Sequence, residues 1–190
     1  MHYIDKIYTH TLEIKQSKFI TYLTPYSEFE KTLSSLKVQH PKARHFVIAY
    51  RHFNTFDQVV EASSDDGEPK GTSGKPSLMV LQGACVMNVG VVIVRYFGGT
   101  KLGTGGLVRA YSDAVNSVLE KAQLIPYKKE ITKEIQFAYT NVGKVEYLCT
   151  QYEITIVDKV FETQAKYSIK STQENLEDFI KKADRLVELI

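Results

Sequence analysis

The sequence is poor in cysteine and has no long apolar run. Its two cysteines, Cys85 and Cys149, are too few and too far apart for a disulfide framework or a metal cluster. Both lie in segments whose pattern predicts helices, so we expect two small buried hydrophobic residues. No stretch approaches the ~20 apolar residues of a membrane helix, and the N-terminus has no cationic segment followed by an apolar one. These absences predict a cytoplasmic protein that does not enter a membrane.

A strong excess of charge of one sign is also missing. The chain has 24 basic and 22 acidic side chains, for a net charge of +2. This balance gives no general attraction to nucleic acid or membranes, although a local patch remains open. Residues 1–127 carry 14 basic and 11 acidic side chains, and residues 128–190 carry 10 and 11. The front portion is therefore the better candidate for binding anions.

The front portion has the pattern of an α+β domain. Alternating and periodic apolar residues predict a hairpin over 9–14 and 19–23, a helix from Ser27 to Pro41, strands over 46–50 and 59–62, a helix over 77–87, a strand over 89–97 and a helix over 105–124. Ser27 and Glu30 have the spacing of a capping box. The strand over 89–97 is the most apolar run, which predicts a central position buried on both faces.

The last sixty residues follow a second pattern. After a linker at 126–129, the sequence predicts a strand over 131–139, a helix over 141–151, strands over 154–157 and 160–169, a helix over 173–183 and a strand over 185–190. This β-α-β-β-α-β order is the ferredoxin-like arrangement. We therefore expect two domains, residues 1–126 and 130–190.

Five of the eleven glycines lie in one short segment, residues 98–106, which we call the glycine turn. Glycine permits positive φ and close approach of another group, and the free N–H groups at the start of a helix attract anions. A turn between a buried strand and a helix is therefore suited to a phosphate or another anion. Thr104 stands where a P-loop has lysine, and Val108 replaces the last glycine of the dinucleotide pattern. The alternative is that these glycines only permit tight packing.

Charged residues near the glycine turn leave two interpretations open. Arg95 ends an apolar strand, where a charge needs a partner or a water-facing position. Arg109 lies on the first turns of the next helix, where the dipole does not favour a cation, so a bound anion or a salt bridge is expected. The acidic side chains of the polar loop, residues 63–76, could supply that partner, bind a hard cation or move a proton. His45 could reach a cleft, although a structural role fits it better.

Two long segments carry a resemblance to a known family. They are Ser64–Pro69 with Gly71–Pro76, and Val94–Tyr111; Lys15–Ile20 and His45 ahead of Ala49–Arg51 agree with them. Together they resemble the YigZ/IMPACT family. The resemblance implies an N-terminal domain like the second domain of a ribosomal small-subunit protein, and a ferredoxin-like C-terminal domain like domain V of elongation factor G. It also implies a link to translation, because eukaryotic relatives are translation regulators.

Three hypotheses follow for function. The first is a binding module for RNA, the ribosome or another anionic ligand. The second is a hydrolase acting on a phosphorylated or peptide substrate, for which no nucleophile–base pair is visible. The third is an interaction protein whose motifs only brace the fold. We expect no cofactor, and the oligomeric state stays open. The expected ligand-binding residues are Arg95, Gly98, Gly99, Lys101, Gly103, Gly105, Gly106 and Arg109, with Asp65, Asp66, Glu68 and Lys70 in the polar loop.

Overall fold

The computed structural model describes residues 1–190 and divides into two compact units, Met1–Tyr127 and Lys128–Ile190. We call them the N-terminal and C-terminal units. Each has an antiparallel sheet and a hydrophobic core of its own. The short strands β1 (His2–Tyr3) and β7 (Ile125–Pro126) pair with each other near the two ends of the N-terminal unit. No helix combines the length and the apolar character needed to cross a bilayer.

The N-terminal unit is built on a five-stranded sheet of order β2-β3-β6-β4-β5 in which all neighbours are antiparallel. Its strands are β2 (Tyr8–Ile14), β3 (Ser17–Pro25), β4 (His45–Phe53), β5 (Val59–Ser64) and β6 (Val89–Tyr96). The apolar strand β6 takes the predicted central position, and its first seven residues are buried. Its β-branched side chains fill both faces of the sheet.

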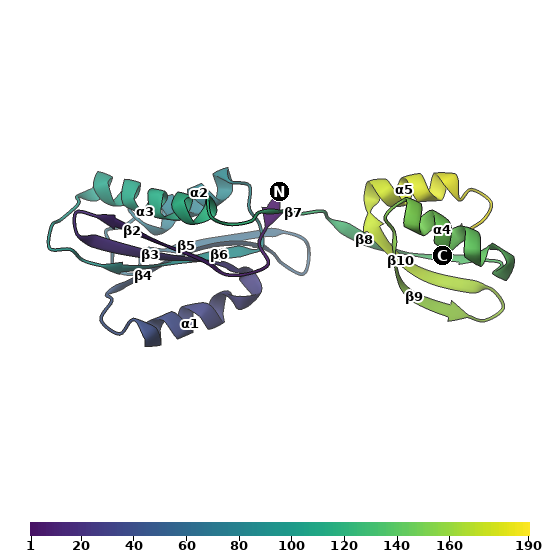
Figure 1. Ribbon diagram of the computed structural model, residues 1–190, viewed down its shortest axis with the longest axis horizontal. Coiled ribbons are helices and arrows are strands. Elements are labelled where there is room, and N and C mark those ends of the chain that lie inside the picture. The colour runs from purple at the N-terminus through teal and green to yellow at the C-terminus, as the bar shows by residue number, and fades with distance from the viewer. The chain divides into compact units, whose positions relative to one another are not determined.

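Helices cover both faces of this sheet (Figure 1). Helices α2 (Gly74–Gly83) and α3 (Thr104–Leu119) lie on one face, and α1 (Phe29–Gln39) lies on the other. Alternate residues of β6 supply the two cores: Val91 and Ile93 pack beneath α2 and α3, while Val92 and Val94 pack beneath α1. Arg95 follows Val91 and Ile93 on the face of α2 and α3.

Three helix boundaries differ from the sequence prediction. No capping box forms at Ser27, because Tyr26–Glu28 make a 3₁₀ turn and α1 begins at Phe29 without a side-chain cap. Helix α2 covers Gly74–Gly83 rather than 77–87, since Pro76 is tolerated in a first helical turn. Helix α3 ends at Leu119, five residues before the predicted end.

The C-terminal unit has the predicted β-α-β-β-α-β order, with strand order β11-β8-β10-β9. Its elements are β8 (Glu130–Phe137), a 3₁₀ turn (Tyr139–Asn141), α4 (Val142–Gln151), β9 (Thr155–Phe161), β10 (Ala165–Thr172), α5 (Gln173–Lys182) and β11 (Glu188–Leu189). Both helices lie on the same face of the sheet (Figure 1). Their apolar stripes pack on Ile135, Tyr167 and Ile169 of the strands.

Two further predictions are wrong. The predicted break between strands 154–157 and 160–169 is absent, because Asp158 and Lys159 lie inside β9, where the register against β10 shifts, and the reversal comes at residues 162–164. Cys85 is not a buried helical residue: it follows α2, is exposed, and has a φ of 51°. Cys149 is buried in α4, as predicted.

Candidate functional site

The glycine turn joins the central strand β6 to α3, and most of it is open to solvent. Gly99 and Gly103 have φ values of 86° and 73° and nothing within 4 Å of an added Cβ, so their role is conformational. Gly98 has a different role, because a Cβ there would lie 2.0 Å from the carbonyl carbon of Gln16. Its N–H donates to Ser17 Oγ at 3.1 Å. The turn is therefore fastened to the β2–β3 hairpin at Gly98 and open to solvent at Gly99 and Gly103.

The first turn of α3 has no protein group at its amino end. Gly103 precedes the helix without a side-chain cap, and no acidic residue lies in the first turn. The first N–H groups of a helix lack intrahelical acceptors and carry a partial positive charge. Thr104 and Gly105 are exposed at this end, and their N–H groups donate to no protein acceptor. This helix start can therefore receive an anion from solution.

Helix α2, by contrast, already has an anion at its start. Asp65 accepts hydrogen bonds from the N–H groups of Gly71, Ser73 and Gly74 at 2.7, 3.1 and 2.8 Å. It also accepts from the Ser73 hydroxyl at 2.6 Å. Burial by itself would raise the pKa of Asp65, but these bonds outweigh it and hold the pKa below its ordinary value. Asp65 is thus engaged in organising the polar loop.

Asp66 is also engaged with the backbone. Its Oδ2 accepts from the N–H of Phe46 at 2.6 Å, and its carbonyl oxygen lies 2.9 Å from His45 Nδ1. Asp66 has a φ of 43°, so the loop bends sharply where it meets the start of β4. These contacts fasten the polar loop to the start of β4, where His45 lies opposite Arg95.

Glu68 is the acidic partner of Arg95. Both side chains are buried, with 4% and 6% of their surface exposed, and Glu68 Oε1 lies 2.5 Å from Arg95 Nη1. The Tyr111 hydroxyl of α3 donates to the same carboxylate oxygen at 2.8 Å. Burial, and then the adjacent Glu68 charge, raises the pKa of Tyr111 far above its ordinary value. Arg95 Nε is buried without a hydrogen-bond partner, so this guanidinium keeps an unused donor.

Two cavities meet at Arg95 and the exposed ring of Phe97. One, of about 380 Å³, is lined by Lys42, Arg44, His45, Arg95, Tyr96 and Phe97. The other, of about 330 Å³, is lined by Glu68, Pro69, Arg95, Phe97, Lys101, Leu102, Gly103, Thr104 and Leu107. Four basic side chains line the pair, and the only carboxylate is that of Glu68, which Arg95 already neutralises. We call this region the basic cleft.

The structure brings together some of the residues expected from sequence and separates others. Arg95, Lys101, Gly103 and Glu68 line the basic cleft. Gly98, Gly99, Gly105 and Gly106 belong to the same turn and first helical turn but line neither cavity. Arg109 and Lys70 are exposed, without an ion pair or hydrogen bond, and also lie outside these cavities.

Sequence reasoning missed Lys42 and Arg44. They lie in the segment between α1 and β4, far from the glycine turn in sequence, and reach it because β4 pairs with β6 so that His45 lies opposite Arg95. The alternation of charged and apolar residues at the start of β4 is the only local signal. Knowledge of which strand neighbours β6 is needed to use it.

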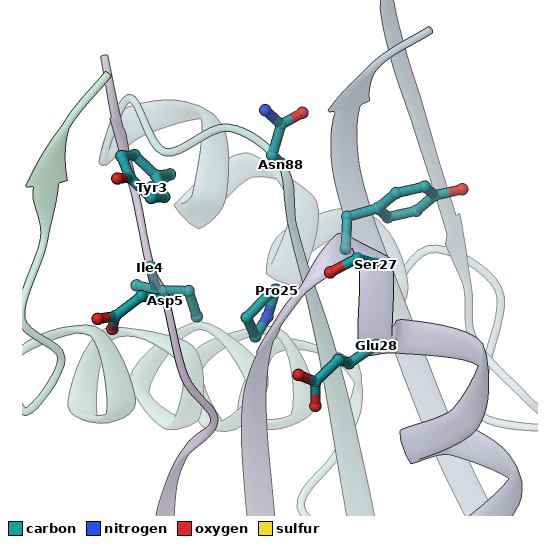
Figure 2. A pocket seen from close by; sticks show the side chains of 8 residues that line it. Tyr3, Ile4, Asp5, Pro25, Ser27, Glu28 and Asn88 are labelled. Atoms are coloured by element: carbon teal, nitrogen blue, oxygen red, sulfur yellow. The ribbon is translucent and has the colours of Figure 1, made fainter. Parts of the chain in front are cut away.

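A further cavity of about 500 Å³ lies elsewhere in the N-terminal unit, between β1 and the start of α1 (Figure 2). Its polar lining includes Asp5, from the segment after β1, and Glu28, from the turn before α1 (Figure 2). The two carboxylates give it a sign of charge opposite to that of the basic cleft. It therefore does not extend an anion site.

The fold and the cleft define a class: two-unit α+β proteins with an open, basic helix start at the end of a central strand. Comparison with known proteins agrees with the division into two units. Residues 15–119 match the model of the Impact N-terminal domain, and residues 135–186 match a domain of unknown function, DUF1949. The chain belongs to the IMPACT family.

Bacterial relatives cover most of the chain. It is 35% identical over 170 residues to an IMPACT family member of Haemophilus influenzae, an alignment that covers 88% of this chain and 82% of the relative. It is 39% identical over 155 residues to the IMPACT family member YigZ of Escherichia coli, covering 79% and 75% of the two chains. A crystal structure described as that of a hypothetical protein has a TM-score of 0.66 at 30% identity, covering 100% of this chain and 95% of that one.

Proposed function

We propose that this protein is a translation-related binding module that recognises RNA, the ribosome or another anionic ligand through the basic cleft. The single observation that carries the proposal is the contrast between two helix starts in one unit. Asp65 occupies the amino end of α2, whereas the amino end of α3 is open beside Lys101 and Arg95. A helix start with flanking cations is a favourable place for phosphate.

The distribution of unpaired cations also favours the N-terminal unit. Lys42, Arg44, Lys101 and Arg109 have exposed side chains and no ion pair. In the C-terminal unit, Lys159, Lys166 and Lys170 are each paired, with Glu146, Glu162 and Glu130. Phosphate binding gains free energy mainly by releasing counterions from cations that are not already neutralised. The N-terminal unit is therefore the proposed contact.

Membership of the IMPACT family supports the link to translation, because the resemblance to that family implies eukaryotic relatives that regulate translation. We further propose the ribosomal-protein-like fold for residues 1–126, and the elongation-factor-like ferredoxin fold for residues 130–190. A translation partner would also place the protein in the cytoplasm. Expected ligand contacts are Arg95, Lys101 and Arg109 with the amides of the glycine turn.

The contacts of the polar loop weigh against the hydrolase alternative. Asp65 and Asp66 accept from backbone N–H groups, and Glu68 is held by Arg95 and Tyr111. A carboxylate acting as base or cation ligand needs a lone pair directed at the substrate or ion. Each of these three carboxylates is instead engaged by hydrogen-bond donors of the protein.

The test is salt-dependent binding of the full chain to fluorescein-labelled RNA. Lys101→Gln removes one charge from the cleft, and Lys37→Gln removes one from the exposed face of α1 as a matched control. We expect Lys101→Gln to weaken binding and to reduce the slope of log K against log salt by roughly 0.7–0.9. Lys37→Gln should leave both unchanged. Absence of RNA and ribosome binding at low salt would overturn the proposal.

A further inference from the structure

The ring of Phe97 is largely exposed, although it lies just beyond the buried central strand β6. Strand β6 is buried up to Arg95, yet the side chain of Phe97, two residues on, has 56% of its surface exposed. Arg95 Cζ lies over the ring at 5.8 Å from its centroid. The guanidinium thus supports the ring from the protein side. An aromatic ring that is exposed and held in place is a suitable platform for another planar group.

Phe97 lines both cavities of the basic cleft, and each cavity has an exposed cation of its own. Lys42 and Arg44 belong to one cavity, and Lys101 with the start of α3 belongs to the other. Consecutive phosphates on both sides of one base would find separate cationic partners. The arrangement fits a polymer in which charged phosphates alternate with planar bases better than it fits a single small anion.

We propose that the basic cleft binds single-stranded RNA, with one unstacked base on Phe97 and the flanking phosphates at Lys42 and Arg44 on one side and at Lys101 and the α3 start on the other. This inference rests on the proposed function and specifies its ligand. Single strands expose base faces that stack on aromatic side chains, whereas bases in a duplex are stacked on one another. The cleft should therefore discriminate against duplex RNA.

The sequence offers a matched control for Phe97. Phe56, in the turn between β4 and β5, is 81% exposed and lines neither cavity of the cleft. Phe97→Leu and Phe56→Leu each replace an exposed ring by an aliphatic side chain with no change in charge. Phe97→Tyr keeps the ring and is the conservative variant.

The experiment measures fluorescence anisotropy of the full chain with a ten-nucleotide single-stranded RNA, the same RNA in a duplex, and DNA of the same sequence. Phe97→Leu should weaken single-strand binding by about 5- to 150-fold, the range expected for loss of one stacked base, without changing the salt slope. Phe97→Tyr and Phe56→Leu should bind as the wild type does. Equal melting temperatures would confirm that the variants are folded.

The outcomes separate this inference from the broader one. Single-stranded and duplex RNA could bind with equal affinity and the expected salt slope, with Phe97→Leu changing neither affinity. The stacking site would then be wrong, and the anion-binding function would stand. If no RNA binds, both the stacking site and the proposed function are wrong. DNA binding as tight as RNA binding, with the same Phe97 dependence, would support the stacking site but overturn its assignment to RNA.

Discussion

Three neighbouring acidic residues of the polar loop have three different tasks, and each is decided by the donors it meets. Asp65 holds backbone amides at the start of α2, Asp66 fastens the loop to β4, and Glu68 is buried against Arg95. The sequence predicted a cluster that could bind a cation, move a proton or pair with arginine. Their separation could not be predicted, because it depends on which amides and strands the loop passes.

Asp65→Asn tests the first of these tasks. The amide keeps one acceptor oxygen but loses the charge that several N–H groups share, so we expect the free energy of unfolding at neutral pH to fall by about 1–2 kcal/mol. Asp113→Asn, at an exposed position of α3, is the matched control and should change it little. Urea unfolding followed by circular dichroism gives both values.

The difference in free energy of unfolding between the wild type and Asp65→Asn should depend on pH in a defined direction. The folded-state pKa of Asp65 is lowered, so its carboxylate stabilises the fold above the unfolded-state pKa of about 4. That stabilisation is lost as the pH falls from there through the folded-state pKa. The gap between wild type and Asp65→Asn should therefore narrow as the pH falls below about 4. A gap that stays constant down to acid unfolding would contradict the assigned role.

At the scale of elements, the glycine turn shows that glycines close in sequence can serve unrelated needs. Gly98 is needed because the backbone of Gln16 lies against it, whereas Gly105 has nothing within 4 Å of an added Cβ. Sequence reasoning predicted the turn and its two neighbouring elements correctly. It could not separate close packing from openness to a ligand, because the hairpin that packs on Gly98 lies some eighty residues earlier.

Two alanine substitutions distinguish the glycine that is needed for close packing from the one that lies in open space. Gly98→Ala places a methyl group into the backbone of the β2–β3 turn, and we expect it to lower the free energy of unfolding by about 1–3 kcal/mol or more. Gly105→Ala should leave it unchanged or raise it by up to about 1 kcal/mol, because alanine favours a helix over glycine. Thermal unfolding of both variants provides the measurement. Equal destabilisation would mean that crowding at Gly98 is not the reason for that glycine.

Element types followed from periodicity, but several boundaries did not. The apolar run of β6 and the stripe of α3 predicted a central strand and its covering helix, since burial on both faces or on one face leaves a pattern in the sequence. Asp158 and Lys159 have the composition of a turn but lie within an edge strand, where solvent accepts charged side chains. Lys42 and Arg44 reached the cleft through strand pairing, which no local pattern encodes.

At the scale of the whole molecule, the two units differ more in how many of their basic side chains form ion pairs than in their net charge. The N-terminal unit has a small surplus of basic side chains, several of them unpaired around the cleft. The C-terminal unit has nearly equal numbers, and on its sheet Glu130 pairs with Lys170 and Glu162 with Lys166. A count of charges predicted the N-terminal unit as the better anion binder. The pairing pattern gives a stronger physical reason, because a paired lysine has already released its counterion.

Two double variants with the same change in net charge test this reason. Lys42→Gln with Arg44→Gln removes two unpaired cations of the cleft, and Lys166→Gln with Lys170→Gln removes two paired lysines of the C-terminal unit. For single-stranded RNA, the first pair should reduce the slope of log K against log salt by roughly 1.4, or about 0.7 per phosphate contact. The second should leave the slope unchanged and alter the stability of the C-terminal unit only slightly, since exposed ion pairs contribute little. If the lysines of the C-terminal unit changed the slope as much as the cleft residues did, RNA would contact that unit as well, and the cleft alone could not account for binding.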